Sequence, residues 1–245
     1  MIKRVLIACV LLLVVINVAQ AKSIHLNYKA TFGIFGKVGT IKNILTENNT
    51  TYKIETKVEL AGFAKVIMGG QVEEYVSVGH MENGLMVSDS YSMTSTKKNQ
   101  KKIKEYHIDH KQKYVTKRYR KWVKGKLIKD YTQKLDFYAK DDLLTLYFNL
   151  GNTVTQKGKT YHFKAVGLEK QKGKVDITVP AENQIAKYKK DLGKAHLYAK
   201  ALIYQKNFRK KKGDILLAID EDGFIKKSVI KDILMFGDAQ LIRIK

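Results

Sequence analysis

Apolar and polar residues alternate along short runs through most of this chain. The clearest run is 52–60, where lysine and glutamate separate residues of apolar or β-branched character. Successive side chains of a β-strand point to opposite faces, so this pattern predicts a strand with one buried face. The buried set is Tyr52, Ile54, Thr56, Val58 and Leu60, and the exposed set is Lys53, Glu55, Lys57 and Glu59.

Residues 213–245 predict a closing β-meander. Alternation in 213–220 is followed by the turn sequence Asp-Glu-Asp-Gly at 220–223 and resumes in 224–235. A bend at 236–238 then precedes a last apolar run at 241–244. We expect these strands to close a barrel or a curved sheet.

Further strand patterns occupy most of the chain. They lie at 23–32, 38–45, 72–78, 85–94, 113–123, 127–138, 161–168, 174–179 and, with a more ambiguous pattern, 195–206. The predicted fold class is mainly β, as a single large antiparallel β-barrel or a strongly curved sheet with one or two short helices. A second helix is expected at 185–192, between Pro180 and Gly193.

Residues 141–151 carry the clearest helical pattern. Asp141 can cap this helix, and Gly151 can end it in a left-handed conformation. Its apolar stripe is Leu143, Leu146, Tyr147 and Leu150, and Leu144 and Phe148 extend the apolar surface most of the way round. Such a helix must be buried on nearly all sides, so we expect it across the open end of a barrel or against the concave face of a sheet.

Residues 1–21 have the pattern of a cleaved signal peptide. Lys3 and Arg4 precede an apolar run at 5–16, and 19–21 form a small-x-small cleavage site. The run is shorter than the roughly 20 residues of a membrane span, so we favour a signal peptide over an anchor. Residues 6–9 also resemble the box at which bacterial lipoproteins are acylated, but Cys9 comes too early in the apolar run. We therefore expect a periplasmic or secreted protein and no lipoprotein.

Residues 22–245 are expected to form a single β-rich domain. They contain no cysteine and one proline, lack a Ser/Gly/Pro-rich linker, and carry a formal charge of +21, because the trimmed segment removes two of the net +23 charges. An exported domain without disulfides must be held together by burial of apolar surface.

Residues 97–134 form a basic, aromatic segment. It has fifteen Lys and Arg residues against three acids, and Lys124-Gly125-Lys126 predicts a hairpin tip between two long strands. Much of this charge should project from one β-ribbon. The candidate anion-contacting patch is Lys113, Lys117, Arg118, Arg120, Lys121, Trp122, Lys124 and Lys126.

Residues 60–70 are apolar, small and flexible, without a clean helical or strand period. We interpret them as a short helix or a mobile flap, which could serve as a portal to a cavity. Together with the helix at 141–151 they give a candidate ligand cavity or lid: Leu143, Leu146, Tyr147, Phe148, Leu150, Phe63, Ile67 and Met68. The alternative is that the helix simply fills the interior.

No catalytic or metal-binding pattern is found, so we expect no enzyme activity and no cofactor. His107 and His110 would lie on opposite faces of a strand, and Asp220 and Asp222 lack the later oxygen ligands of a calcium loop. Asn49 lies in an Asn-x-Thr sequence with Glu47 two residues before it, which is a candidate glycosylation site or an ordinary polar turn.

Three segments together resemble a family of exported bacterial proteins known as domain of unknown function 3108. They are the tyrosine-containing opening strand and glycine turn (28–39), the leucine-rich helix after an acidic cap (141–148), and the closing Asp-x-x-Gly hairpin that ends in Phe236-Gly237-Asp238. The resemblance implies an extracytoplasmic antiparallel β-fold, lipocalin-like in shape only. Lipocalins carry Gly-x-Trp on their first strand, and the one tryptophan here is Trp122.

The sequence supports two functional hypotheses above a third. The first is an exported carrier or binder of an apolar, lipid-like molecule, or an envelope-maintenance factor. The second is a basic surface module that associates with anionic envelope components such as lipopolysaccharide, phospholipid or glycan. Export argues against nucleic acid as a physiological partner, an enzyme is the least favoured reading, and the sequence says nothing about oligomeric state.

Overall fold

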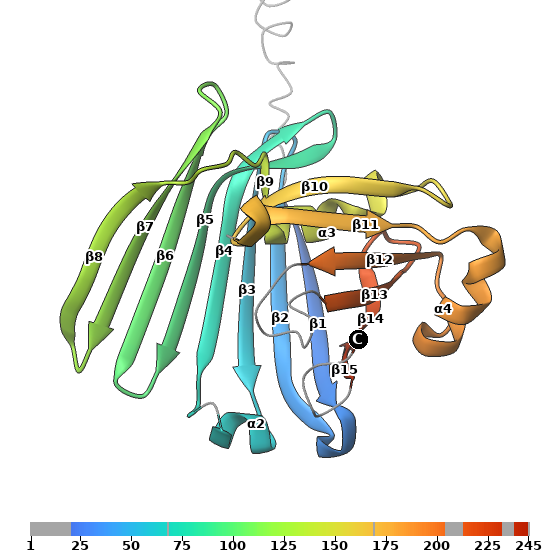
Figure 1. Cartoon of the computed structure of the whole chain (residues 1–245), viewed down its shortest axis with the longest axis horizontal. Helices are drawn as coiled ribbons and strands as arrows, with labels where there is room; N and C mark the ends of the chain where they lie inside the picture. Colours follow the sequence, from blue (N-terminus) through green and yellow to red (C-terminus); the bar gives the residue numbers. More distant parts are fainter. Residues whose placement is uncertain (1–20, 68, 169, 204–212, 232–237, 245) are drawn as a thin grey trace, which may run out of the picture.

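The computed structural model describes residues 21–67, 69–168, 170–203, 213–231 and 238–244, which form one large sheet (Figure 1). Its fifteen strands lie in the order β8-β7-β6-β5-β4-β3-β2-β1-β15-β14-β13-β12-β11-β10-β9. Neighbouring strands pair antiparallel, except for the parallel pair β9 and β10. The predicted mainly β, antiparallel fold is confirmed.

Two meanders make up the sheet. The first contains β1 (Lys22–Phe32), β2 (Lys37–Glu47), β3 (Thr51–Leu60), β4 (Val72–Glu82), β5 (Leu85–Lys97), β6 (Gln100–Asp109), β7 (Tyr114–Val123) and β8 (Lys126–Lys134). The second contains β10 (Thr160–Val166), β11 (Lys174–Thr178), β12 (Leu197–Ile203), β13 (Gly213–Ile219), β14 (Ile225–Ile230) and β15 (Ala239–Ile244), with the short β9 (Asp141–Asp142) beside β10.

The last strand of the chain pairs with the first. β15 pairs with β1 so that Arg243 lies opposite Tyr28. The fully buried Tyr28 hydroxyl donates to the carbonyl of Ile225 on β14 at 2.8 Å. The two meanders are thereby one continuous sheet. The predicted bend residues Phe236 and Gly237 lie outside the described residues.

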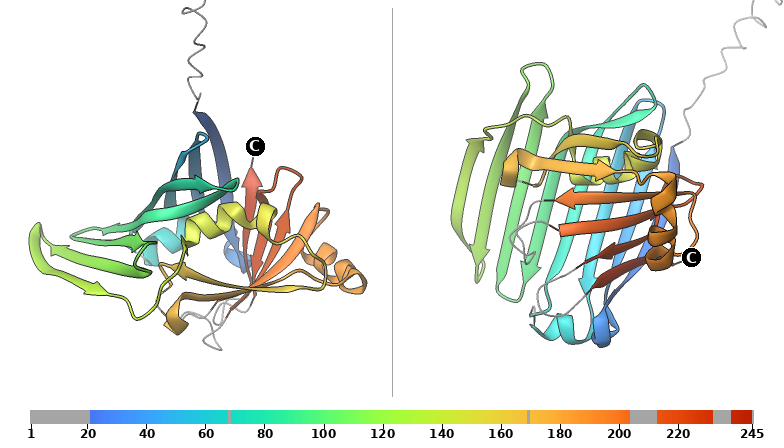
Figure 2. Two further views of the ribbon diagram at one scale, coloured as in Figure 1. Left: turned by 90° about the horizontal axis from the view of Figure 1, so that it is seen from above. Right: turned by 45° about the vertical axis from the view of Figure 1, so that its right-hand side comes forward.

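The sheet is strongly curved but not closed. Seen from above, the two meanders form the walls of an open trough, and β6 to β8 extend beyond it (Figure 2). The terminal strands β8 and β9 do not pair with each other. Of the two shapes expected from the sequence, the structure is the curved sheet.

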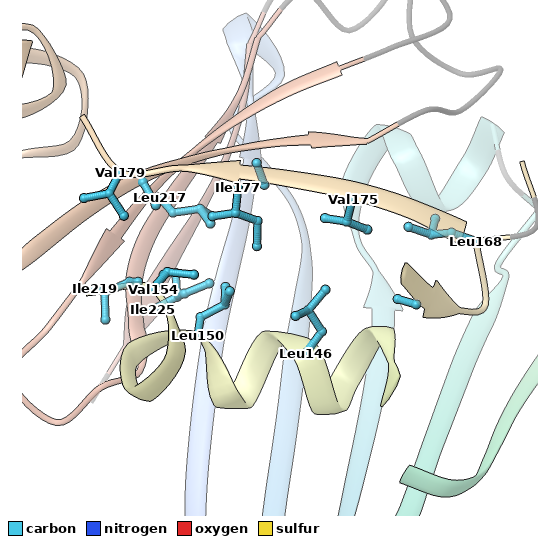
Figure 3. Packing of buried hydrophobic residues seen from close by; sticks show 13 residues of the cluster. Leu146, Leu150, Val154, Leu168, Val175, Ile177, Val179, Leu217, Ile219 and Ile225 are labelled. Atoms are coloured by element: carbon cyan, nitrogen blue, oxygen red, sulfur yellow. The ribbon is translucent and has the colours of Figure 1, made fainter. Parts of the chain in front are cut away.

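A buried helix, α3 (Leu143–Thr153), lies inside the trough. Leu146 and Leu150 point toward Val175 and Ile177 of β11 (Figure 3). On the other side Phe148 packs in the cluster that contains Tyr28, Leu45 and Ile54 from the first meander. The helix therefore fills the space between the walls, and burying each large apolar side chain contributes about 1.5–3 kcal/mol.

Both predicted ends of this helix need correction. The cap is Asp142, whose carboxylate accepts from the backbone N–H groups of Leu144 and Thr145 at 2.7 and 3.1 Å, and Asp141 precedes it. Gly151 lies within the helix and does not end it. A Cβ there would lie 2.3 Å from the carbonyl oxygen of Gly223, so glycine is needed for close packing against the β13–β14 turn.

The other helices are short. α4 (Ile185–Leu192) confirms the predicted second helix: Leu192 is buried, Ile185 and Tyr188 pack against the same cluster, and Gly193 follows with a φ of 78°. α2 (Gly62–Ile67) shows that the ambiguous segment 60–70 contains a short helix. Three short 3-10 segments, η1 (Gly33–Phe35), η2 (Lys170–Gly173) and η3 (Glu182–Gln184), lie in connections.

We call β6 to β8 the ribbon. Strand β6 was not predicted, and β8 ends at Lys134, before the expected end at residue 138. A bulge lies in β8, since Lys121 faces Lys129 but Trp122 faces Leu127. Leu127 and Tyr131 were expected to share a face with Leu135 and Phe137, and the bulge breaks that pattern. Phe137 instead packs into the core.

Candidate functional site

The trough remains open along one line, which we call the seam. Strand β5 pairs with β6 from Ser90 onward, so residues 85–89 have no strand partner on that side among the described residues. Strand β10 pairs with β9 only at Ala165 and Val166, which leaves residues 160–164 unpaired on their outer edge. These two edges, with α3 and residues 138–141 between them, surround one pocket.

The seam pocket has a volume of about 690 Å³. Its wall is largely apolar, and four lysines and a histidine stand among its lining residues. The lining is Leu85, Met86, Val87, Tyr138, Ala139, Lys140, Asp141, Leu146, Asn149, Thr153, His162, Phe163, Lys164, Gln171, Lys172 and Lys174. The pocket therefore has an apolar wall and a positively charged rim.

Asn149 seals part of the seam. Its side-chain N–H donates to the carbonyl of Met86 at 2.8 Å, and its side-chain oxygen accepts from the Met86 N–H at 3.2 Å. The amide thus replaces a missing strand partner at the edge of β5, and it is buried. Buried backbone groups need such partners, so Asn149 fixes α3 to this edge.

A buried polar network holds the start of α3 against the first wall. The Asp142 carboxylate accepts from the hydroxyls of Ser77 and Thr145 at 2.5 and 2.8 Å, besides the two backbone bonds of the cap. The Tyr52 hydroxyl bonds with that of Thr145 at 2.7 Å. Burial raises the pKa of Asp142, and these hydrogen bonds oppose the rise. The network is the structural reason for the aspartate at this position.

Asp141 differs from its neighbour although both are mostly buried. One of its carboxylate oxygens is buried without a hydrogen-bond partner among the described residues. Burial, and then the charge of Asp142, raises the pKa of Asp141 to about 7, while Lys140 opposes the shift. The seam pocket is therefore lined by a carboxyl group that changes its charge near neutral pH.

A histidine cluster, which the sequence did not indicate, adjoins the pocket. Asp89 lies 3.0 Å from Nδ1 of His80 and 3.4 Å from Nε2 of His110. His110 also bonds with the hydroxyl of Tyr138 at 2.9 Å and with the carbonyl of Ser88 at 2.8 Å. His110 is thus a structural residue that joins the end of β6 to the seam.

The rim lysines differ in their partners. Lys140 pairs with Glu82 at 2.5 Å, Lys174 with Asp176 at 3.1 Å and Lys172 with Asp136 at 3.7 Å. Lys164 has no ionic partner among the described residues and is exposed. Solvent-exposed pairs of this kind contribute little to stability, so the lysines can turn toward a bound anion at small cost.

The predicted cavity residues are placed as follows. Leu146, Phe148 and Leu150 are buried in the core, Leu143 and Tyr147 are partly buried there, and of these five Leu146 alone lines the seam pocket. These side chains pack in the two core clusters on either side of the helix. Met68 and the side chains of Phe63 and Ile67 lie outside the described residues.

The short helix α2 is far from the pocket. It precedes β4 at Val72, whereas the pocket lies beyond the other end of β4, where β5 begins. An eleven-residue strand spans roughly 36 Å at about 3.3 Å per residue. α2 is therefore not a lid for the seam pocket.

The predicted basic patch is spread over both faces of the ribbon. Ser77 faces α3, and the register carries that inner face through Tyr91 and Tyr106 to Lys117, so Lys121 lies there too. Arg118 and Arg120 lie on the outer face. The structure does not bring these residues onto one surface.

The two arginines are also engaged by acids. Arg118 makes two hydrogen bonds to Asp130, at 3.0 and 2.7 Å, and Arg120 bonds Glu105 at 2.6 Å and lies over the ring of Trp122. Lys117 is 5% exposed. Lys113 is exposed at one end of β7, and Lys124 and Lys126 are exposed at the other. The exposed lysines of the predicted patch therefore lie at the two ends of β7.

Asn49 is exposed in the turn between β2 and β3. The neighbouring Asn48 builds that turn, since its side-chain oxygen accepts from the backbone N–H groups of Thr50 and Thr51 at 2.9 and 2.8 Å. Of the two asparagines, Asn49 is the one whose side chain is not used by the turn among the bonds described.

In the described part of the chain, no group of three or more His, Cys, Asp and Glu side chains is arranged to hold a metal ion. In the same residues no helix is both long and apolar enough to cross a membrane.

No protein-family model and no curated protein matches the chain. Among solved structures, it is similar to the beta-barrel-like protein of domain of unknown function DUF1849 from Brucella abortus, with 10% sequence identity and a TM-score of 0.48 over 90% of this chain and 95% of that one.

Proposed function

We propose that this protein is an exported, non-enzymatic binder of an amphiphile, whose apolar chain occupies the seam pocket and whose anionic headgroup meets the lysine rim. The observation that carries the proposal is the composition of the pocket: apolar wall residues from β5, α3 and β10 with lysines around them. A volume of about 690 Å³ is within the range of small-molecule sites in proteins.

The pocket chemistry favours an acid or phosphate headgroup over a neutral one. Lys140, Lys164, Lys172 and Lys174 lie around the pocket, and Asp141 is the one carboxylate among its lining residues. A charge-assisted hydrogen bond from a lysine to a ligand oxygen is about twice as strong as a neutral one. The rim therefore supplies orientation, and the apolar wall supplies most of the binding free energy.

The proposal also includes an extracytoplasmic location and a relationship to the domain of unknown function 3108 family. The signal-peptide pattern at residues 1–21 supports a location outside the cytoplasm, in the periplasm or beyond. The resemblance to domain of unknown function 3108 supports an extracytoplasmic role in the cell envelope. Binding rather than catalysis is proposed because two polar lining residues already have partners: Asn149 bonds the backbone of Met86, and His162 bonds Asp176 at 2.7 Å.

Titration with a fluorescent long-chain fatty acid tests the binder. Thr153→Arg places a long polar side chain into the pocket, and Asn152→Arg, one residue earlier on the exposed side of α3, is the matched control. We expect the first to weaken binding at least about tenfold and the second to leave it unchanged. Equal binding by both variants, or no uptake by the wild-type protein, would reject the pocket.

The rim is tested with a pair of charge reversals. Lys164→Glu with Lys172→Glu should weaken binding of the fatty acid but not of the corresponding fatty alcohol, because the alcohol lacks the charge. Lys126→Glu with Lys129→Glu on β8 makes the same change in net charge far from the pocket. If both pairs act alike, the rim has no specific role.

A second candidate function is contact of the ribbon with an anionic envelope surface. Lys124 and Lys126 are exposed at its tip, beside the exposed apolar residues Leu127 and Ile128, each 50% exposed. Such a tip suits contact with an anionic envelope surface, whose attraction is screened beyond about 8 Å at physiological salt. Flotation with anionic vesicles that does not weaken between low and physiological salt would contradict this electrostatic contact.

A further inference from the structure

We infer that the outer edge of β8 accepts an extended, acidic segment of another polypeptide, which adds a strand to the sheet at the ribbon. β8 ends the sheet, and every one of its residues is exposed. Over Lys129–Lys134 it pairs with β7 in an unbroken register. Its far side therefore presents a regular row of backbone donors and acceptors without a strand partner among the described residues.

An edge of this length needs an explanation. Edge strands are usually kept short, or blunted by proline, bulges or charge, because they pair readily with other chains. β8 has nine residues and no proline, and its bulge lies near one end. Its three lysines disfavour pairing with a positively charged strand but not with an acidic one. Leu127, Ile128 and Tyr131 are 44–50% exposed. The edge thus offers both backbone pairing and apolar contact, which are the two components of strand addition.

The charge of the ribbon selects the partner. Residues 97–134 carry fifteen basic residues against three acids, and two of those acids, Glu105 and Asp130, are bound to Arg120 and Arg118. Lys126, Lys129 and Lys134 on β8 are exposed and have no ionic partner among the described residues. A second copy of this chain would bring two strongly positive ribbons together, whereas an acidic segment would neutralise them.

Backbone pairing also distinguishes a polypeptide partner from a membrane surface. An anionic surface can contact the lysines but cannot satisfy a row of N–H and C=O groups in strand register. A polypeptide segment with acidic residues at alternate positions can do both. Its acidic side chains would lie beside Lys129 on the inner face and Lys134 on the outer face, depending on register.

A synthetic peptide as long as β8, alternating glutamate with valine, is the probe. Fluorescence anisotropy measures its binding, and hydrogen exchange measures protection of the β8 amides. The matched control is the same peptide N-methylated at alternate residues, which keeps the charge but removes the donors along one edge. We expect the control to bind at least about tenfold more weakly, and the unmodified peptide to protect alternate amides of β8.

A protein variant completes the test. Lys129→Glu with Lys134→Glu changes exposed residues only, and it should abolish binding of the glutamate peptide and favour a lysine–valine peptide instead. Equal binding of the methylated peptide would overturn strand addition. So would protection of the β8 amides by anionic vesicles alone, or a concentration-dependent dimer that protects them without any peptide.

Discussion

The adjacent aspartates at the start of α3 should respond in opposite ways to substitution. Asp141 has a buried oxygen without a hydrogen-bond partner in the described part of the chain, and its pKa is raised from 3.8 to about 7 by burial and by Asp142. The folded state thus holds the Asp141 proton more strongly than the unfolded state does. Stability contributed by the protonated form is lost as the pH rises from about 4 through about 7.

The size of the effect follows from the shift. A change from 3.8 to about 7 corresponds to about 4 kcal/mol at a pH above both values. Because Asp141 is not completely buried, we expect Asp141→Asn to raise the free energy of unfolding by about 2–4 kcal/mol at pH 8 and to change it little at pH 4. Asp142→Ala should instead cost about 2–4 kcal/mol, since it removes the helix cap and leaves buried donors unpaired.

Urea denaturation of the three proteins across that pH range measures these differences. The decisive quantity is the difference in slope between wild type and Asp141→Asn, because other titrating groups are common to both. Parallel pH profiles, or a loss of stability in Asp141→Asn at high pH, would refute the assigned burial of this carboxylate.

Two further substitutions test the packing of α3. Gly151→Ala should destabilise the protein by about 1–3 kcal/mol, although alanine favours helices, because its Cβ would meet the backbone of Gly223; Asn152→Ala on the exposed side is the control, and equal stability of the two variants would contradict the contact. Asn149→Leu should cost about 2–4 kcal/mol by leaving the N–H and C=O of Met86 unpaired, and hydrogen exchange at the Met86 amide should accelerate; unchanged protection there would refute the bridge.

The period-two pattern locates strands wherever one face of the sheet is buried. The run at 52–60 is confirmed as β3, with Tyr52, Ile54 and Thr56 buried. The pattern fails on β6, where Lys102 and Lys104 lie on the inner face with Tyr106. That part of the sheet extends beyond α3, so the inner face carries lysines there and the alternation disappears.

The ends of α3 show a limit of local reasoning. Asp141 and Asp142 both fit the position before a helix. Asp142 makes the cap bonds, and the hydroxyl of Ser77 on β4 holds its carboxylate in place. Gly151 fits a helix end by residue type, yet its role is set by Gly223 from a distant hairpin. In both cases the deciding contact comes from another part of the chain.

The seam pocket could not be predicted either, because its lining residues are brought together from separate parts of the chain. Its lining comes from five separate segments, from Leu85 on β5 to Lys174 on β11. The sequence correctly marked α3 as the centre of the interior, and Leu146 is shared by the predicted cavity and the observed pocket. The other predicted residues of α3, Leu143, Tyr147, Phe148 and Leu150, pack in the core clusters on either side of the helix.

Photo-crosslinking tests the central claim most directly. A fatty acid with a diazirine near its chain end, bound to the full protein and activated by light, should label residues around the seam, such as Met86, Ala139 and Phe163. Peptide mapping by mass spectrometry locates the label. Labelling there that an excess of unmodified fatty acid suppresses is the expected result. Labelling confined to the ribbon, or spread evenly over the surface, would contradict a binding pocket at the seam.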